Sequence, residues 1–397
     1  MNIRIHFFSV FALVCVHGLA GVSAQNDFRY AQQMRTHSLP KKPSSPTVPA
    51  STTETVVAFS GLAISGVSMS TSRLATDDDQ ARNRKKISGV EIVYSDQYAI
   101  NLMGLELLHP FDIHKYKKIV NKLGRDGVLE KKRIHEPKEI TQEEILLVHS
   151  PKFLDSLDDH KAVLRYLEAD FLRALPASIV RTGILKPFRY SAGGTLLAAD
   201  LAWKKKCVAI NIGGGYHHAK PDKGEGFCIY ADIPIAIRKL QKQGKIKRAL
   251  IIDVDAHQGN GTICCLANDD STFCFSMHQG SIYPIPKETG DLDIALKRRT
   301  GDDEFLEILK NELPKITKKS KPDMVFVVGG CDPLDGDPLA GLKMTPAGIV
   351  KRDQMIVDFC VKQNLPVVFT LAGGYSKNAW KSQYESVRNL LKIHGKK

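Results

Sequence analysis

The segment ALIIDVDAHQGNG, residues 249–261, joins an apolar strand pattern to a cluster of reactive polar side chains. Residues 249–254 are aliphatic except for Asp253, a pattern typical of a strand buried on both faces of a parallel sheet. Asp255 and His257 follow this run directly. Because residues two apart on extended backbone point to the same side, their carboxylate and imidazole can reach a single cation.

Four further apolar runs have a similar length and are soon followed by Gly, Asp or His; they lie at 207–212, 272–277, 324–328 and 367–371. Segments of helical length separate or follow them, at 233–242, 302–313, 345–363 and 378–393, and two more lie upstream at 112–123 and 141–148. This alternation predicts one α/β domain in which a mostly parallel sheet lies between two layers of helices.

The strand runs lead to the residue types that carry chemistry. The first of these four runs precedes His217 and His218, the third precedes Asp332, and the fourth precedes Tyr375, each beside glycines. Parallel sheets bring the carboxyl ends of their strands to one edge, so we expect these side chains to meet there. Neither a GxGxxG motif opening a helix nor a Walker-type motif occurs, so nucleotide binding gains no support.

We predict a catalytic site for a divalent metal at Asp255, His257 and Asp332. Three protein ligands leave a coordination position open, whereas a structural site is closed by four. The ion would polarise a carbonyl and lower the pKa of bound water, and the His217–His218 pair would supply proton transfer. Taken singly, Asp332 could belong to an ordinary turn and the histidine pair could be structural. Their shared position after strands favours the metal site.

The composition sets the broad class of the protein. The chain has 397 residues, of which 43% are hydrophobic, and its formal net charge is +13. These values exclude wholesale disorder, a collagen-like chain and a polytopic membrane protein. The basic residues are scattered among acids, so no direct nucleic-acid binding is expected. The eight cysteines form no CxxC pair, which predicts free buried thiols instead of a disulfide framework or zinc finger.

The first 88 residues predict targeting and linker segments. Residues 1–24 have a basic residue before an apolar stretch and end in Val-Ser-Ala, the layout of a signal peptide. This leader predicts a secreted, periplasmic or organelle-targeted protein, whereas an unused leader would leave the chain cytoplasmic or nuclear. A signal anchor or bipartite leader is the alternative, and no transmembrane core is expected. Residues 25–88 read as a disordered Ser/Thr/Pro-rich linker, and residues 89–395 as the catalytic domain.

Several motifs resemble those of histone deacetylase-type zinc amidohydrolases, especially the class IV branch and its bacterial relatives. In family order they are LHPFD (108–112), VHSP (148–151), GGT (193–195), GYHH (215–218), GFC (226–228), DVDAHQGNG (253–261), GL (341–342) and GGY (373–375). The resemblance extends over nearly the whole of residues 90–391. It implies a three-layer arginase/deacetylase fold with an eight-stranded, mostly parallel sheet and helices on both faces.

The resemblance also implies roles for the polar residues. Asp255, His257 and Asp332 would hold Zn²⁺, with Fe²⁺ as an alternative ion. His218 would act as general base and acid, and His217 as its electrostatic partner. Metal-activated water would then attack the amide carbonyl of an acyl-lysine in a protein or peptide.

Further residues are assigned in the same way. Asp253 would orient His217, and the Tyr375 hydroxyl would donate a hydrogen bond to the carbonyl and its oxyanion. The resemblance further implies a substrate tunnel lined by Gly226, Phe227, Tyr216 and Tyr283. It also implies a K⁺ site to which Asp253 and Ser276 contribute.

Asn260 departs from the pattern of many relatives, which carry an acid at this position, whereas class IV members carry an amide. An amide stabilises an imidazolium less than a carboxylate does, so we expect a lower pKa for His218 than in an Asp-paired relative. This leaves open which histidine is the general base.

Other functions fit the residues less well. An arginase-like two-metal site would need an acid at Gly259, two residues after His257. A non-catalytic protein of the same fold is disfavoured because every metal and proton-transfer position is filled. The residues fit removal of either an acetyl group or a longer acyl chain. The main alternative to a lysine deacylase is a deacylase of small acetylated amines such as polyamines.

Overall fold

The computed structural model describes residues 86–395, so the predicted signal peptide and nearly all of the predicted linker lie outside the described residues. Within these residues eight strands form one sheet, and all of its pairings are parallel. In spatial order the strands are β2 (Ile134–His135), β1 (Val90–Val93), β3 (Val208–Asn211), β8 (Val367–Thr370), β7 (Met324–Val328), β4 (Ala249–Asp253), β5 (Thr272–Gln279) and β6 (Leu292–Leu296).

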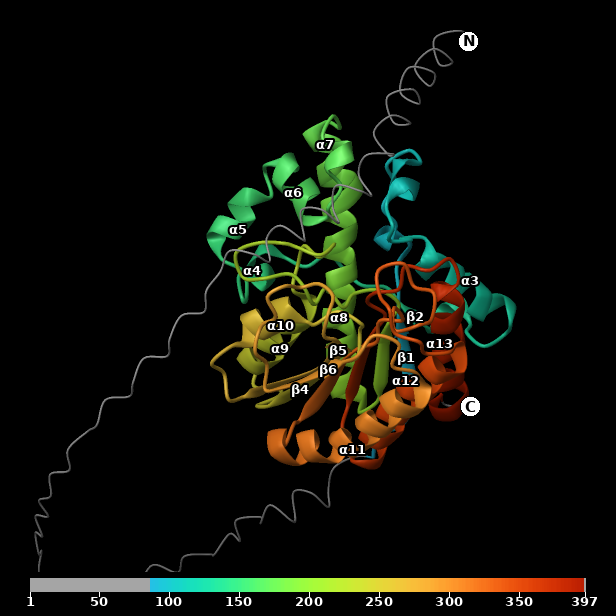
Figure 1. Ribbon diagram of the computed structural model, residues 1–397. Coiled ribbons are helices and arrows are strands. Elements are labelled where there is room, and N and C mark those ends of the chain that lie inside the picture. Colours follow the sequence, from blue (N-terminus) through green and yellow to red (C-terminus); the bar gives the residue numbers. More distant parts are fainter. Residues whose placement is uncertain (1–85, 396–397) are drawn as a thin grey trace, which may run out of the picture. The chain divides into compact units, whose positions relative to one another are not determined.

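Helices cover both faces of the sheet (Figure 1). One layer contains α3 (Lys115–Arg125), α11 (Asp302–Ser320), α12 (Pro346–Lys362) and α13 (Ala379–His394). The other contains α4 (Gln142–Ile145), α5 (Pro151–Ser156), α6 (His160–Tyr166), α7 (Ala177–Val180), α8 (Lys186–Lys205), α9 (Asp232–Lys242) and α10 (Asn260–Leu266).

The two hydrophobic cores follow from the alternation of side chains along each strand. In β4, Leu250 and Ile252 pack in the core with α3 and α11–α13, whereas Ile251 packs in the core with α8 and α9. Both faces of the central strands are therefore buried, which explains their continuous apolar sequence. The predicted three-layer α/β architecture is confirmed, with a wholly parallel sheet in the described residues.

Some elements differ from the sequence prediction. Helix α11 continues through Pro314 to Ser320, beyond the predicted end at residue 313. Helix α8 was not predicted because it contains Gly193 and Gly194, which disfavour a helix. Packing explains both glycines: an added Cβ at Gly193 would collide with the Lys138 carbonyl, and one at Gly194 with the Tyr98 hydroxyl.

In the described residues the thiols of Cys228, Cys264, Cys265, Cys274, Cys331 and Cys360 are free, as predicted. Of these, Cys264 and Cys265 are half-buried and the others are buried. In the same part of the chain, no helix combines the length and apolar character needed to cross a membrane.

Candidate active site

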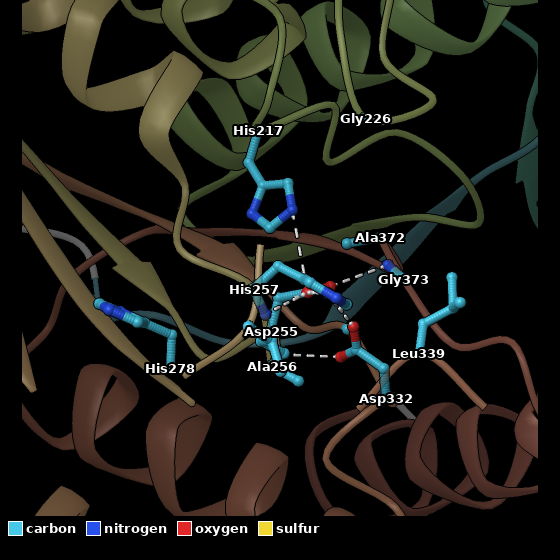
Figure 2. A network of polar contacts seen from close by, with 12 residues as sticks. His217, Gly226, Asp255, Ala256, His257, His278, Asp332, Leu339, Ala372 and Gly373 are labelled. Atoms are coloured by element: carbon cyan, nitrogen blue, oxygen red, sulfur yellow. Dashed lines mark hydrogen bonds and ion pairs between the residues drawn. The ribbon is translucent and has the colours of Figure 1, made fainter. Parts of the chain in front are cut away.

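Asp255, His257 and Asp332 converge beyond the carboxyl ends of β4 and β7. One ligand atom from each residue lies within 4.8 Å of the others, and all three side chains are buried. His257 Nδ1 is 2.8 Å from Asp332 Oδ2 and 3.2 Å from Asp255 Oδ1. Figure 2 shows the three side chains facing one another, with His217 on the far side of Asp255. The parallel sheet thus brings together the side chains of Asp255 and Asp332, which are 77 positions apart in the sequence.

The backbone holds the two carboxylates in place. The Ala256 amide donates to Asp332 Oδ1 at 2.8 Å, and the Gly373 amide donates to Asp255 Oδ2 at 3.0 Å (Figure 2). An added Cβ at Gly330 would collide with the Asp255 carboxylate. Glycine is therefore required where the β7 loop passes the cluster.

The donor set fits a divalent cation. Burial and repulsion from Asp255 both raise the pKa of Asp332, so the two adjacent carboxylates favour a positive charge between them. Two carboxylates and one imidazole form a three-ligand set suited to Zn²⁺. Asp255, His257 and Asp332 would be the residues that hold the ion.

His217 is paired with a carboxylate. Its Nδ1 lies 2.8 Å from Asp253 Oδ2, and its Nε2 lies 3.8 Å from Asp255 Oδ1. Burial lowers the pKa of His217, but the charges of Asp253 and Asp255 outweigh burial and raise it to about 9. His217 is therefore an imidazolium at neutral pH, which suits an electrostatic role.

His218 is paired with an amide. Its Nδ1 lies 2.7 Å from Asn260 Oδ1, at the start of α10. Burial and the nearby charges of His217 and His257 hold the pKa of His218 well below its usual value. His218 is therefore neutral at physiological pH and can accept a proton, the property that a general base needs.

A cavity opens beside these histidines. His217, His218 and Tyr375 line it together with the predicted tunnel residues Tyr216, Gly226 and Phe227. Burial raises the pKa of Tyr375 well above its usual value, so its hydroxyl is a neutral hydrogen-bond donor. Most of the remaining lining is apolar, although Glu106 and His109 belong to it; the apolar residues include Leu102, Ile113, Leu172, Ile184 and Phe188.

Tyr283, which sequence reasoning also placed in the tunnel, is not among the residues that line this cavity. Its ring instead packs edge-on against His218, with 5.0 Å between the ring centroids, and lies 6.5 Å from the ring of His257. Tyr283 therefore flanks the His218 ring and does not line this cavity.

A tight turn at Glu225–Cys228 forms part of the cavity lining. The Cys228 amide donates to the Glu225 carbonyl at 3.0 Å, and both central residues, Gly226 and Phe227, have positive φ, at 55° and 65°. This is the type I′ conformation, which is costly for a non-glycine residue such as Phe227. An added Cβ at Gly226 would contact the His218 ring at 2.6 Å, so glycine allows the turn to lie on this histidine.

Asp253 and Ser276, predicted to contribute to a K⁺ site, are register partners on β4 and β5. The Asp253 carboxylate contacts His217, and the Ser276 hydroxyl lies 3.0 Å from His278 Nδ1. Figure 2 shows His278 on the side of the cluster away from Asp332. The K⁺ site remains a prediction.

Two buried cations near the cluster were missed by sequence reasoning. The Lys115 ammonium donates to the Ala372 and Gly373 carbonyls at 2.8 and 3.0 Å, beside the β8 loop that carries Tyr375. The Arg352 guanidinium donates to the Val254 and Gly330 carbonyls at 3.0 and 2.7 Å. Arg352 therefore joins the loops of β4 and β7 that carry the ligands.

Comparison with known proteins identifies the family. A model described as "Histone deacetylase domain" matches residues 109–391, well over half of the chain. The chain belongs to the histone deacetylase family. Members of this hydrolase family are generally metal-dependent, and membership supports deacetylation of acetyl amides as the chemistry of this chain.

Three curated relatives align with most of the folded part of this chain. Histone deacetylase 2 of Arabidopsis thaliana is 38% identical over 335 residues, covering 82% of this chain and 86% of the relative. An uncharacterized protein of Picosynechococcus sp. is 34% identical and covers 73% of this chain and 93% of its own length. Acetoin utilization protein AcuC of Staphylococcus aureus is 30% identical, with coverages of 66% and 70%.

A solved structure has the same fold. The crystal structure of an HDA15 HD domain aligns with a TM-score of 0.63 at 21% identity, covering 76% of this chain and 91% of that chain. At this identity the likeness concerns the fold alone. It confirms the predicted arginase/deacetylase architecture of the histone deacetylase family.

Proposed function

We propose that this chain is a metal-dependent amidohydrolase that removes acetyl or longer acyl groups from lysine side chains of proteins or peptides. One observation carries the proposal. The buried cluster of Asp255, His257 and Asp332 lies directly beside a neutral histidine, a protonated histidine and a neutral tyrosine that line one cavity. These groups supply the base, the electrostatic support and the hydrogen-bond donor that amide hydrolysis requires.

Zn²⁺, or alternatively Fe²⁺, bound by the three ligands would polarise the amide carbonyl and activate water for attack. His218 would accept the proton of the attacking water and deliver it to the departing lysine amine. His217, held protonated by Asp253, would stabilise the negative charge that develops on the carbonyl oxygen. The Tyr375 hydroxyl would donate a hydrogen bond to the same oxygen, which strengthens as the charge grows.

The apolar part of the cavity favours acyl groups longer than acetyl. Its wall includes Leu102, Leu172, Ile184 and Phe188, side chains that offer an alkyl chain no hydrogen-bond partner. Burying each methylene of an acyl chain there would contribute about 0.8 kcal/mol to binding. An acetyl group, with its single methyl, would gain less from these apolar side chains than a longer chain would.

The test is an acyl series on one lysine peptide, from acetyl through octanoyl to myristoyl, measured beside N-acetylated polyamines on the same zinc-reconstituted protein. We expect hydrolysis of the acyl-lysine peptides, with medium or long chains retained as substrates, and inhibition by a hydroxamate that chelates the ion. Ile184→Phe places a larger side chain in the lining and narrows the cavity. It should therefore reduce turnover of long-chain acyl-lysine peptides relative to the acetyl-lysine peptide.

Turnover of polyamines without turnover of any lysine peptide would replace the proposed substrate class by small amines. No hydrolysis of either class by protein with stoichiometric metal would overturn the proposed function. The catalytically impaired variant Tyr375→Phe, prepared in parallel, controls for contaminating hydrolases.

A further inference from the structure

The Asn260 side chain has a second hydrogen-bond partner besides His218. While its Oδ1 faces His218, its Nδ2 donates to Glu225 Oε1 at 2.6 Å. Asn260 is buried, and the Glu225 side chain is 19% exposed. Three residues thus form a continuous chain of hydrogen bonds that runs from the catalytic cavity towards the surface.

Glu225 lies among cations that keep it ionised. Its Oε2 lies 2.6 Å from the Lys223 ammonium, and its Oε1 lies 3.6 Å from that of Lys220. An ionised carboxylate only accepts hydrogen bonds. The amide nitrogen of Asn260 must therefore point to Glu225, and the amide oxygen must point to His218.

The orientation of this amide fixes the position of a proton. The Asn260 oxygen can only accept, so the atom of His218 that faces it, Nδ1, must carry the hydrogen. A neutral imidazole has one N–H, and Nε2 on the opposite side of the ring then keeps its lone pair. That is the nitrogen with which His218 can accept a proton within the cavity.

We propose that Glu225 is a positioning residue that locks the Asn260 amide and thereby holds His218 in the Nδ1–H tautomer required of a general base. The inference rests on the proposed function and deepens it by explaining how an amide replaces a carboxylate beside the catalytic histidine. With Glu225 removed, the amide can rotate and present its NH₂ group to Nδ1. His218 would then carry its hydrogen on Nε2 and could not act as a base.

The Glu225 turn also carries Phe227 and lies on the His218 ring, so a structural effect must be separated from the tautomer effect. A carboxylate at position 260 accepts hydrogen bonds through either oxygen and needs no orientation. Glu225→Ala should therefore impair the natural protein but have little further effect when it is combined with Asn260→Asp. A purely structural role for Glu225 would impair both backgrounds equally.

The decisive measurement is ¹⁵N NMR of histidine-labelled, zinc-reconstituted protein, with the His218 signals assigned by their loss in His218→Gln. We expect Nδ1–H in the natural protein and a shift towards Nε2–H in Glu225→Ala. Glu225→Gln is isosteric and can present either amide atom to Asn260, so it should give a mixture even if the alanine variant fails to fold. The natural tautomer retained in the glutamine variant, or in a folded alanine variant, would overturn the proposal.

Kinetics provide the second readout. Glu225→Ala should lower kcat by about 10-fold with little change in KM, because the fraction of competent base falls while the cavity remains. Glu288→Gln is the matched control: Glu288 contacts the same Lys220, at 2.9 Å, and its variant should leave kcat near that of the natural protein. A loss in Glu225→Ala that persists undiminished with Asn260→Asp would contradict the proposal. The NMR result does not depend on turnover, so natural protein that shows the expected tautomer but hydrolyses no amide would refute only the proposed function.

Discussion

His217 and His218 are adjacent in the chain, and their ring centroids lie 4.0 Å apart. Their Nδ1 atoms nevertheless contact different types of side chain. Nδ1 of His217 faces the Asp253 carboxylate at 2.8 Å, whereas Nδ1 of His218 faces the Asn260 amide oxygen at 2.7 Å. Both imidazoles are buried, and burial lowers the pKa of each. Only at His217 do carboxylates outweigh it and raise the pKa to about 9.

The difference shows that the charges around each ring decide which of two buried imidazoles is protonated: the Asp253 and Asp255 carboxylates act on His217, whereas His218 has an amide at Nδ1 and is repelled by the charges of His217 and His257. The carboxylates favour the protonated form of His217, and in the described part of the chain no carboxylate contacts Nδ1 of His218 to offset the effect of burial. Under the proposed function, one dipeptide would supply both an electrostatic group and a base, because β4 and the start of α10 present different residues to its two rings.

Replacing each histidine tests this division directly and has the largest expected effect. His218→Ala should lower kcat for an acyl-lysine peptide by about 100-fold or more, since proton transfer is lost. His217→Ala should lower it less, because only the fixed charge is removed. An equal or larger loss in His217→Ala would reverse the two roles.

Tyr375→Phe removes the hydroxyl that, in the proposed function, would donate to the same carbonyl oxygen that the His217 charge stabilises. The hydroxyl is neutral and acts only as the negative charge develops, so we expect kcat to fall by about 100-fold with a nearly unchanged KM. Single-turnover kinetics with the zinc-loaded variant would separate the chemical step from binding. A rise in KM at constant kcat would show that the tyrosine merely binds substrate.

Asp253→Asn makes the partner of His217 resemble that of His218. Without this carboxylate the pKa of His217 falls, so its charge is lost as the pH rises through neutrality. We expect about a 10-fold loss of kcat at pH 8 and a smaller loss at pH 6, because the lower pH restores the charge. A pH–rate profile with a loss independent of pH would contradict this role for Asp253.

The interaction between His217 and Asp253 also contributes to the free energy of unfolding, and this effect is the smallest of those predicted. The folded pKa of His217 is about 9, above its ordinary value of 6.5. Its contribution to the free energy of unfolding is therefore complete below pH 6.5 and is lost as the pH rises to about 9. Metal-free protein should lose a few degrees in Tm across this interval, on the order expected for a domain of this size. Thermal unfolding of Asp253→Asn should show a flatter dependence on pH.

The sequence predicts the parts of the site that lie next to strands. The apolar runs indicate where the strands end, and in a parallel sheet this is enough to bring Asp255, His257 and Asp332 to one edge. The helix α8 could not be predicted, because its glycines are required by contacts with Lys138 and Tyr98 that local sequence does not reveal.

The supporting residues are missed for a related reason. Lys115 belongs to the lysine-rich segment HKYKKIVNK (114–122), in which Lys117 and Lys118 are exposed and nothing local marks Lys115 as buried. Its carbonyl partners lie more than 250 residues away in the chain. Glu225 belongs to the charged segment KPDKGE (220–225), and nothing in this segment indicates that it contacts Asn260. Only the fold brings Asn260, at the start of α10, beside it.

The metal content of purified protein bears on the whole mechanism. Chelator-treated protein should be reloaded with Zn²⁺ by equilibrium dialysis, with bound metal and deacylation measured on the same samples, beside Asp332→Ala treated in the same way. We expect one ion per natural chain, recovery of activity in proportion to bound metal, and neither in the variant. Full activity in natural chains that retain less than about a tenth of an equivalent of metal, or stoichiometric binding that survives loss of the Asp332 carboxylate, would contradict the three-ligand site.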